Sequence, residues 1–199
     1  AEKHGKPIDI HLHERDTMGG FSMEEIIART KALGMQGKVT VSHAFCLGAI
    51  DRAYVAGLHE ALAENQIHII TTAPASAPVP AVKELVALGI LTGSGSDGIR
   101  DTWGPYGNAD MLARACIVGQ RNNLRRDDEV ELALDICTFG GAAIMELKGY
   151  GLGIGDMADC VLVEGETLTE AVATHAPRKL VLKAGRVIAR DGICVIEAP

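Results

Sequence analysis

The sequence of 199 residues lacks three features that would indicate particular partners. Lys and Arg number 19 against 26 Asp and Glu, a net charge of −7, so the basic surface that binds nucleic acid is missing. No apolar run approaches the roughly 18 residues of a membrane span, and no segment resembles a signal peptide. We therefore expect no nucleic acid and no membrane partner. Hydrophobic residues make up 47% of the chain, which is enough for a buried core and excludes a disordered chain.

The cysteine spacing excludes a further group of proteins. The sequence contains no C-x-x-C motif, so it is neither a zinc ribbon nor one of the small zinc-dependent nucleobase deaminases. An odd number of widely scattered cysteines is typical of a reducing compartment rather than of a disulfide scaffold. We predict a cytoplasmic protein with buried, inert thiols. The cysteines are Cys46, Cys116, Cys137, Cys160 and Cys194.

The first 150 residues alternate short segments rich in Val, Ile and Thr with segments of helical periodicity. This alternation predicts βαβ units and a parallel sheet. The first helix is marked by Ser22 and Glu25 as a capping box and by Gly34 as its stop. The predicted strands are Pro7–His13, Lys38–His43, Ile67–Thr72 and Ile90–Gly95, and the predicted helices are Ser22–Leu33, Asp51–Glu64, Pro80–Leu88, Asn108–Leu124 and Asp128–Leu147.

The tail has a different pattern, so we divide the chain into residues 1–150 and residues 151–199. Three short apolar segments separated by glycines predict small antiparallel strands, with a hairpin turn at Ala184-Gly185. We expect a small β unit beside the α/β body. The predicted strands are Asp159–Val163, Lys179–Leu182 and Arg186–Arg190.

Polar side chains follow three of the four predicted strands of the first part. The first strand ends in His11, His13 and Glu14, the second in His43, and the fourth in Asp97. Ligands gather at the carboxyl ends of parallel strands, so these side chains are expected to lie together. A single histidine at a strand end is usually structural, but ionisable or metal-binding side chains at three of the four strand ends favour a site.

The residue types at these strand ends suit a divalent metal. Imidazoles bind Zn²⁺ or Fe²⁺, and the carboxylate of Asp97 would complete a site with an open position for water. A metal lowers the pKa of such a water and makes it a nucleophile near neutral pH. His43 and Glu14 are then candidates for orienting that water and transferring protons.

Two glycine-rich segments are weaker signals. Residues 93–98 fit G-x-G-x-x-G after a strand, but residues 100–105 that follow cannot open the helix that a dinucleotide site requires. Residues 151–156 open a β segment, so their glycines indicate turns. We expect no nucleotide site at either segment.

The ordered set of motifs resembles the amidohydrolase superfamily, and in particular the C-terminal half of its cytosine deaminase-like branch. The resemblance runs from about residue 7 to residue 190, and its strength lies in the order and spacing of the pieces. The matching pieces are His11-Leu12-His13-Glu14, Val41-Ser42-His43, Gly95-Ser96-Asp97, residues 101–108 (DTWGPYGN) and residues 151–163 (GLGIGDMADCVLV).

The resemblance implies an α/β fold, the second half (strands 5–8) of a metal-dependent (β/α)₈ TIM-like barrel plus part of a small β-sandwich. It also implies roles for four residues. His11 resembles the metal ligand of the fifth strand, and Glu14 the acid that shuttles protons to the substrate ring. His43 resembles the histidine that activates the water. Asp97 resembles the aspartate that binds the metal and accepts a proton.

The resemblance further implies one divalent metal, Fe²⁺ or Zn²⁺, and a substrate pocket lined by His13, Asp101 and Trp103. Ligand types that serve both metals do not decide between them. An opposing assignment makes His11 and His13 the paired ligands of the first barrel strand. Four βα units before the tail, and Glu14 three residues after His11, favour the fifth strand. One departure is Gly98, where cytosine deaminases typically have a second aspartate.

Three hypotheses about function remain open on the sequence. The first is a hydrolytic deaminase that releases ammonia from a cytosine-like nucleobase or a related amino-substituted N-heterocycle. The second is hydrolysis of a cyclic amide or an N-alkylamino triazine. The third is a non-catalytic half-barrel or interaction module. A closed barrel takes about 250 residues, so we also expect an upstream N-terminal barrel half as a partner, a small heterocyclic substrate, and a homo-oligomer.

Overall fold

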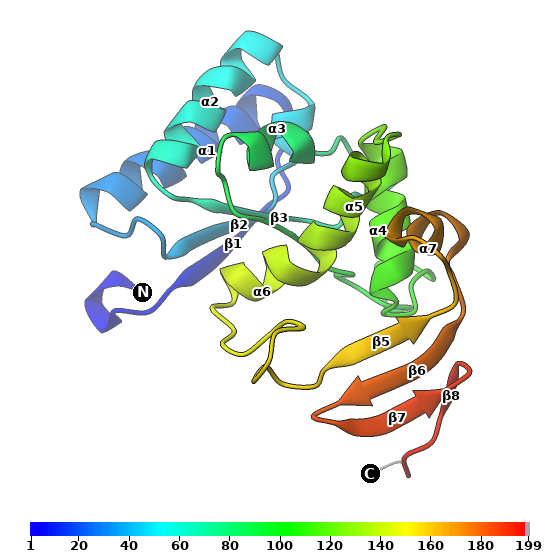
Figure 1. Ribbon diagram of the computed structural model, residues 1–199. Coiled ribbons are helices and arrows are strands. Elements are labelled where there is room, and N and C mark those ends of the chain that lie inside the picture. Colours follow the sequence, from blue (N-terminus) through cyan, green and yellow to red (C-terminus); the bar gives the residue numbers. More distant parts are fainter. Residues whose placement is uncertain (198–199) are drawn as a thin grey trace.

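The computed structural model describes residues 1–197 and contains two separate four-stranded sheets. The first sheet is parallel, and its strands follow one another in chain order (Figure 1). Its strands are β1 (Ile8–Leu12), β2 (Val39–His43), β3 (His68–Thr71) and β4 (Thr92–Ser94). A short 3₁₀ turn, η1 (Glu2–His4), precedes β1, which lies at one edge of this sheet. The α/β fold with a parallel sheet, predicted from the alternating pattern, is thus confirmed.

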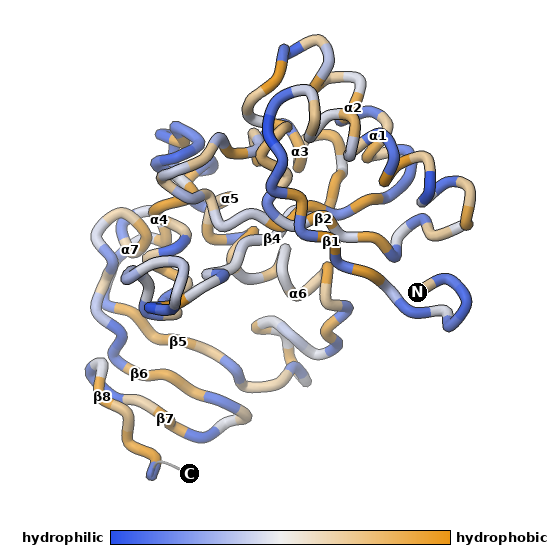
Figure 2. Tube along the Cα trace, turned by 180° about the vertical axis from the view of Figure 1, so that it is seen from behind, coloured by the Kyte–Doolittle hydropathy of each residue, from blue (hydrophilic) through white to orange (hydrophobic). Residues whose placement is uncertain are grey.

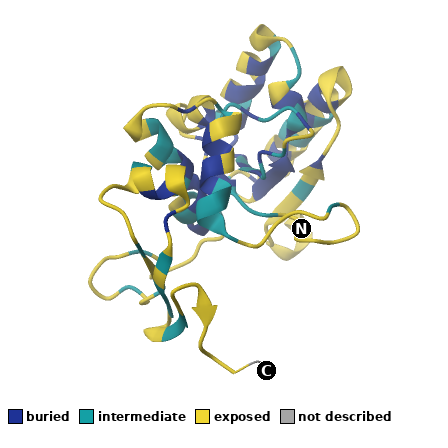
Figure 3. Cartoon of the chain, turned by 90° about the vertical axis from the view of Figure 1, so that its right-hand side faces the viewer, coloured by how far each residue is buried: buried dark blue, intermediate teal, exposed yellow. Residues whose placement is uncertain are grey.

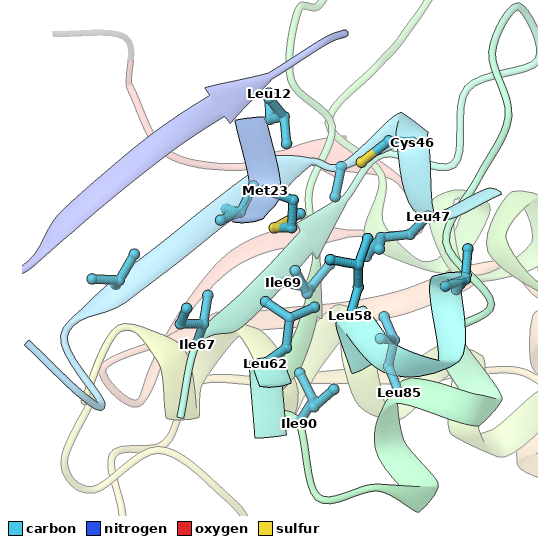
Figure 4. Close-up of a cluster of buried hydrophobic side chains, with 14 of the residues drawn as sticks. Leu12, Met23, Cys46, Leu47, Leu58, Leu62, Ile67, Ile69, Leu85 and Ile90 are labelled. Carbon is cyan, nitrogen blue, oxygen red and sulfur yellow. The ribbon is translucent and has the colours of Figure 1, made fainter. Parts of the chain in front are cut away.

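Three helices cover one face of the parallel sheet (Figure 1). They are α1 (Asp16–Ala32), α2 (Arg52–Glu64) and α3 (Val82–Ala87), with the 3₁₀ turn η2 (Phe45–Gly48) between β2 and α2. Asp51 caps α2, because its Oδ1 accepts the backbone N–H of Ala53 at 2.9 Å. Leucine, valine and methionine side chains from strands and helices fill the space between them (Figure 4). Met23, Val41, Leu62, Ile69 and Leu85 are fully buried there.

The predicted start of the first helix is wrong. α1 begins at Asp16, six residues before Ser22, so Ser22 lies inside the helix rather than at its cap. The extra turn contains Gly19, where a Cβ would lie only 2.6 Å from the Cβ of Cys46. Close packing of this glycine against η2 allows the helix to start earlier than local capping signals indicate. The predicted stop is confirmed, since Gly34 follows the helix with a φ of 62°.

The long helix predicted over residues 128–147 is interrupted. α4 (Met111–Arg121) is followed by α5 (Asp127–Asp135), a π-helical turn η3 (Ile136–Gly140) and α6 (Gly141–Ile144). In this turn the Oγ1 of Thr138 donates to the carbonyl oxygen of Leu134 at 2.9 Å, which competes with regular helix bonds. The bulge presses Gly140 against β4, where a Cβ would lie 2.1 Å from the carbonyl oxygen of Thr92.

Two adjacent glycines give a matched test of this contact. Gly140→Ala is expected to lower the free energy of unfolding by about 3 kcal/mol, because the added methyl group meets the backbone of β4. Gly141→Ala, which meets nothing within 4 Å, should raise it by about 0.5–1 kcal/mol through helix propensity. Urea unfolding of both variants measures the difference. Equal stabilities would contradict the close approach of η3 to β4.

The second sheet is antiparallel, in the order β5-β6-β7-β8. Its strands are β5 (Cys160–Val163), β6 (Arg178–Lys183), β7 (Arg186–Arg190) and β8 (Ile193–Cys194), and α7 (Leu168–Thr174) joins β5 to β6. The hairpin at Ala184-Gly185 is confirmed, with φ values of 49° and 74°. Neither α7 nor β8 was predicted, although Thr167 and Glu170 form a capping signal. Residues 198–199 of the predicted tail lie outside the described residues.

The two parts differ in burial. Buried residues concentrate in the parallel sheet and its helices, whereas the second sheet is exposed or half-buried (Figure 3). Apolar stretches nevertheless run along β5 and β6 (Figure 2), and Val161 and Leu162 are 51% and 52% exposed. A second layer over this sheet, as a sandwich requires, stays a prediction. Among residues 1–197, no helix combines the length and the apolar character needed to cross a bilayer.

Candidate active site

Three histidines gather at the carboxyl end of the parallel sheet. Ile10 and Leu12 of β1 pack against the helix-covered core, so alternation along the strand places His11 on the opposite face. The ring centroids of His11 and His13 lie 5.8 Å apart, and that of His43 lies 4.9 Å and 4.3 Å from them. One ring nitrogen from each lies within 4.8 Å of the others. Such a group could hold a metal ion.

His43 is the buried member of this cluster, whereas His11 and His13 are exposed. It ends β2 with a φ of 74°, an unusual backbone conformation for a residue with a side chain. Burial lowers the pKa of its imidazole, and the neighbouring His13 lowers it further, while Asp97 opposes the shift. Burial therefore favours the neutral form of the ring. Its Nδ1 is buried without a hydrogen-bond partner, and its Nε2 lies 3.4 Å from Nδ1 of His11.

Asp97 reaches the cluster from the end of β4, across β3. Its Oδ2 lies 4.0 Å from the Nε2 of His43, and its own φ is 58°. Glu14 follows His13 at the same edge of the sheet and is exposed, but its carboxylate is not part of the group of possible metal ligands that the three histidines form. The structure thus brings His11, His13, His43 and Asp97 together and leaves Glu14 at the margin.

A hydrogen bond below the cluster was not predicted from the sequence. The Oγ of Ser42 donates to the carboxylate of Asp9, with distances of 2.8 Å to Oδ1 and 3.1 Å to Oδ2. Asp9 precedes His11 by two residues on the same face of β1, and His11 lies beside Ser42 in the register. The bond therefore joins β1 to β2 directly beneath the histidines. The alternation Asp9-x-His11 was the available signal.

An aromatic ring beside the cluster was also missed. Phe45 stacks on His13 with 5.9 Å between ring centroids and an interplanar angle of 25°. Its centroid lies 5.3 Å from that of His43. The guanidinium of Arg15 lies 5.9 Å from the same ring. Phe45 follows His43 by two residues, so its closeness to the motif Val41-Ser42-His43 was the available signal.

The loop of residues 95–109 carries the two predicted pocket residues Asp101 and Trp103. The Oδ1 of Asp101 accepts the backbone N–H of Trp103 at 2.8 Å, which forms a tight turn. A Cβ at Gly98 would lie 2.1 Å from the Oδ2 of Asp101, so Asp101 fills the space of a side chain at position 98. Trp103 is 97% exposed and does not contribute to the histidine cluster. No helix opens directly after residues 93–98, as the sequence predicts.

The parallel sheet with histidines and an aspartate at its strand ends defines an α/β protein with a candidate metal site, and comparison with known families gives the particular group. The amidohydrolase family model matches residues 1–189, and the chain belongs to the amidohydrolase family. A curated relative, N-isopropylammelide isopropyl amidohydrolase of Pseudomonas sp. (strain ADP), is 31% identical over 196 residues. The alignment covers 98% of this chain and 49% of the relative.

Two solved structures agree with this placement. N-isopropylammelide isopropylaminohydrolase from Burkholderia multivorans is 48% identical with a TM-score of 0.93, over 98% of this chain and 50% of that one. The 5-methylcytosine deaminase of Klebsiella pneumoniae, liganded with 5-fluorocytosine, is 27% identical with a TM-score of 0.85, over 100% and 52%. The resemblance to the cytosine deaminase-like branch is confirmed. The chain spans about half the length of the relatives it matches.

Proposed function

We propose that this chain forms part of the active site of a metal-dependent hydrolase that removes an amino or alkylamino substituent from a nitrogen heterocycle. The observation that carries the proposal is the cluster of His11, His13 and His43, with Asp97 4.0 Å from His43. The relatives support the substrate class, because they are hydrolases and deaminases named for ammelide, pterin and cytosine compounds. The proposal includes an upstream barrel half, since the matched relatives are about twice as long.

The donor set fits a divalent metal. Three imidazoles offer ring nitrogens within 4.8 Å of one another, and the buried Nδ1 of His43 has no hydrogen-bond partner in the protein. On the resemblance, His11 and Asp97 would hold Fe²⁺ or Zn²⁺, and His13 lies close enough to join them. Zinc is bound in a solved adenosine deaminase of this fold from Xanthomonas campestris, at 15% identity. When bound, a metal acts as a Lewis acid and lowers the pKa of water.

The residues of the chain divide the proton transfers between them. His43, kept neutral by burial, accepts a proton from the attacking water at Nε2. Asp97, beside that nitrogen, stabilises the imidazolium that results. Glu14 donates a proton to a ring nitrogen of the substrate, which makes the adjacent carbon more electrophilic. The water oxygen bonds to that carbon, and His43 passes the proton it has accepted to the exocyclic nitrogen. The exocyclic C–N bond then breaks, the remaining O–H proton returns to Glu14, and the neutral amine leaves.

The leaving group is ammonia in the first candidate reaction and an alkylamine in the second. Two observations favour the second. The Burkholderia relative at 48% identity is named for removal of an isopropylamino group. Position 98 is Gly98 rather than the expected aspartate, and the side chain of Asp101 fills the space that a side chain at position 98 would take. This difference changes the space available for a substituent on the substrate ring.

Product analysis tests both candidates. The protein for this assay, called the complete barrel below, is this chain joined to the upstream half of the Burkholderia multivorans relative. It is incubated with cytosine and with N-isopropylammelide, and ammonia and isopropylamine are measured by chromatography. We expect release of one amine with the ring intact. A ring-opened acid would overturn the proposal in favour of cyclic amide hydrolysis, and no product from either would favour a non-catalytic module. A homo-oligomer and a cytoplasmic location stay predictions.

A further inference from the structure

The loop of residues 95–109 must be held at both ends if it is to keep Asp97 beside the histidines. Its near end continues β4, which is bonded to β3. Its far end is Asp110, the N-cap of α4, whose Oδ1 accepts the backbone N–H groups of Leu112 at 3.0 Å and Ala113 at 3.2 Å. The Oδ1 of Asn108 accepts the N–H of Asp110 at 3.0 Å. Asp110 is therefore the anchor of the loop.

A residue of the second sheet binds this anchor. Arg178, the first residue of β6, donates from Nη2 to both carboxylate oxygens of Asp110. Its Nη1 donates to the carbonyl oxygens of His175 at 3.1 Å and Ala176 at 3.0 Å, so the guanidinium is fixed from two sides. The side chains of Arg178 and Asp110 are only 21% and 26% exposed. Solvent therefore screens this pair less than the exposed ion pairs of the surface.

The backbone that leads to Arg178 is itself fixed. α7 packs on α4 and α5, and its Val172, 1% exposed, belongs to the same buried cluster as Ala115 and Val118 of α4. Beyond α7 the packing is incomplete, because a cavity of about 930 Å³ lies between α4, α5 and the second sheet. Arg178 and Asp110 both line this cavity. Their ion pair thus joins the two parts of the protein where apolar contact is missing.

We propose that Arg178 is a positioning residue that acts through Asp110 on the loop of residues 95–109, so that the second sheet holds Asp97 and Asp101 in place. The effect on the loop follows from the contacts alone. Its consequence for turnover rests on the proposed function. Arg178 lies far from Asp97 in the sequence, and its contact with the loop anchor becomes visible only in the fold.

Two readouts follow the loop without any substrate, in the full 199-residue chain. Arg100 is the only Lys or Arg in residues 95–109, so tryptic cleavage there reports opening of the loop. Trp103 is the only tryptophan, so its fluorescence anisotropy reports local motion. In Arg178→Met we expect cleavage at Arg100 to be roughly tenfold faster and the anisotropy to fall. Arg178→Lys, which keeps the charge, should recover part of both.

The matched control is Lys183→Met, which removes another cation of β6 whose partner, Asp159, immediately precedes β5. It should leave both readouts unchanged. The proposal would be overturned if Arg178→Met showed the wild-type cleavage rate at Arg100 and the wild-type anisotropy. An equal acceleration of cleavage at Arg29 in α1 would also overturn it, because that result indicates a general loosening of the fold. If Arg178→Met does not fold, Asp110→Asn, which keeps the cap acceptor, takes its place. In the complete barrel, KM should rise about tenfold. A complete barrel without any activity would refute the proposed function while the two loop readouts still decide this inference.

Discussion

Replacement of His43 by glutamine is expected to lower kcat/KM of the complete barrel by about a thousandfold. Glutamine has a similar size and can still hydrogen bond, but it cannot accept a proton from water. His43 is suited to that task because burial lowers its pKa and keeps the ring neutral, while Asp97 lies 4.0 Å from its Nε2. Steady-state kinetics with the substrate identified by product analysis measures the loss.

A second buried histidine provides the matched control. His59 in α2 is 2% exposed, its pKa is also lowered by burial, and its Nε2 has no hydrogen-bond partner in the protein. It packs on the helix side of the sheet, away from the cluster. His59→Gln should therefore change kcat/KM by less than about threefold in the folded protein. A similar loss in both variants would show that His43 acts through stability alone.

The pH dependence of stability follows from the same two histidines. Their pKa values in the folded protein lie below the ordinary value of 6.5. As the pH falls below that value, the unfolded chain therefore binds more protons than the folded protein does. Their contribution to stability is complete above about pH 6.5 and declines as the pH falls below it.

The parallel sheet and most of its site could be predicted from the sequence because both depend on local pattern. The strand Val39–His43 is rich in Val and Thr and follows Gly37, and the βαβ spacing favours a parallel arrangement. Carboxyl ends of parallel strands share one edge, which is why the sequence alone predicts that His11, His43 and Asp97 lie together. This grouping requires only that the strands are parallel and where each one ends.

The features that were not predicted depend on contacts between distant segments. The early start of α1 depends on Gly19 meeting Cys46, and the π-helical turn depends on Gly140 meeting β4. The bond between Asp9 and Ser42 requires the exact pairing of β1 with β2. No local propensity reports such contacts. Capping signals near Ser22 were misleading because tertiary packing outweighs a free energy of about 1 kcal/mol per cap.

Removal of the divalent metal is expected to abolish turnover of the complete barrel, and His11→Ala should lower its metal content from one per chain to below about a tenth. His11 belongs to both ligand sets that remain open, the pair of His11 and Asp97 and the cluster with His13 and His43. Chelation, followed by addition of Zn²⁺ or Fe²⁺, measures recovery of activity. Elemental analysis of the purified variants measures the metal directly, independently of turnover.

The histidine of β3 is the control for this measurement, and His13 distinguishes the two ligand sets. His68 points its Nε2 at the carbonyl oxygen of Gly37, 3.2 Å away, and is not part of the cluster. His68→Ala should therefore keep the metal, and a loss equal to that in His11→Ala would contradict a site at the histidine cluster. If His13→Ala also loses the metal, His13 is a ligand together with His11. If His13→Ala keeps the metal but raises KM, His13 lines the substrate pocket beside Phe45, with which it stacks.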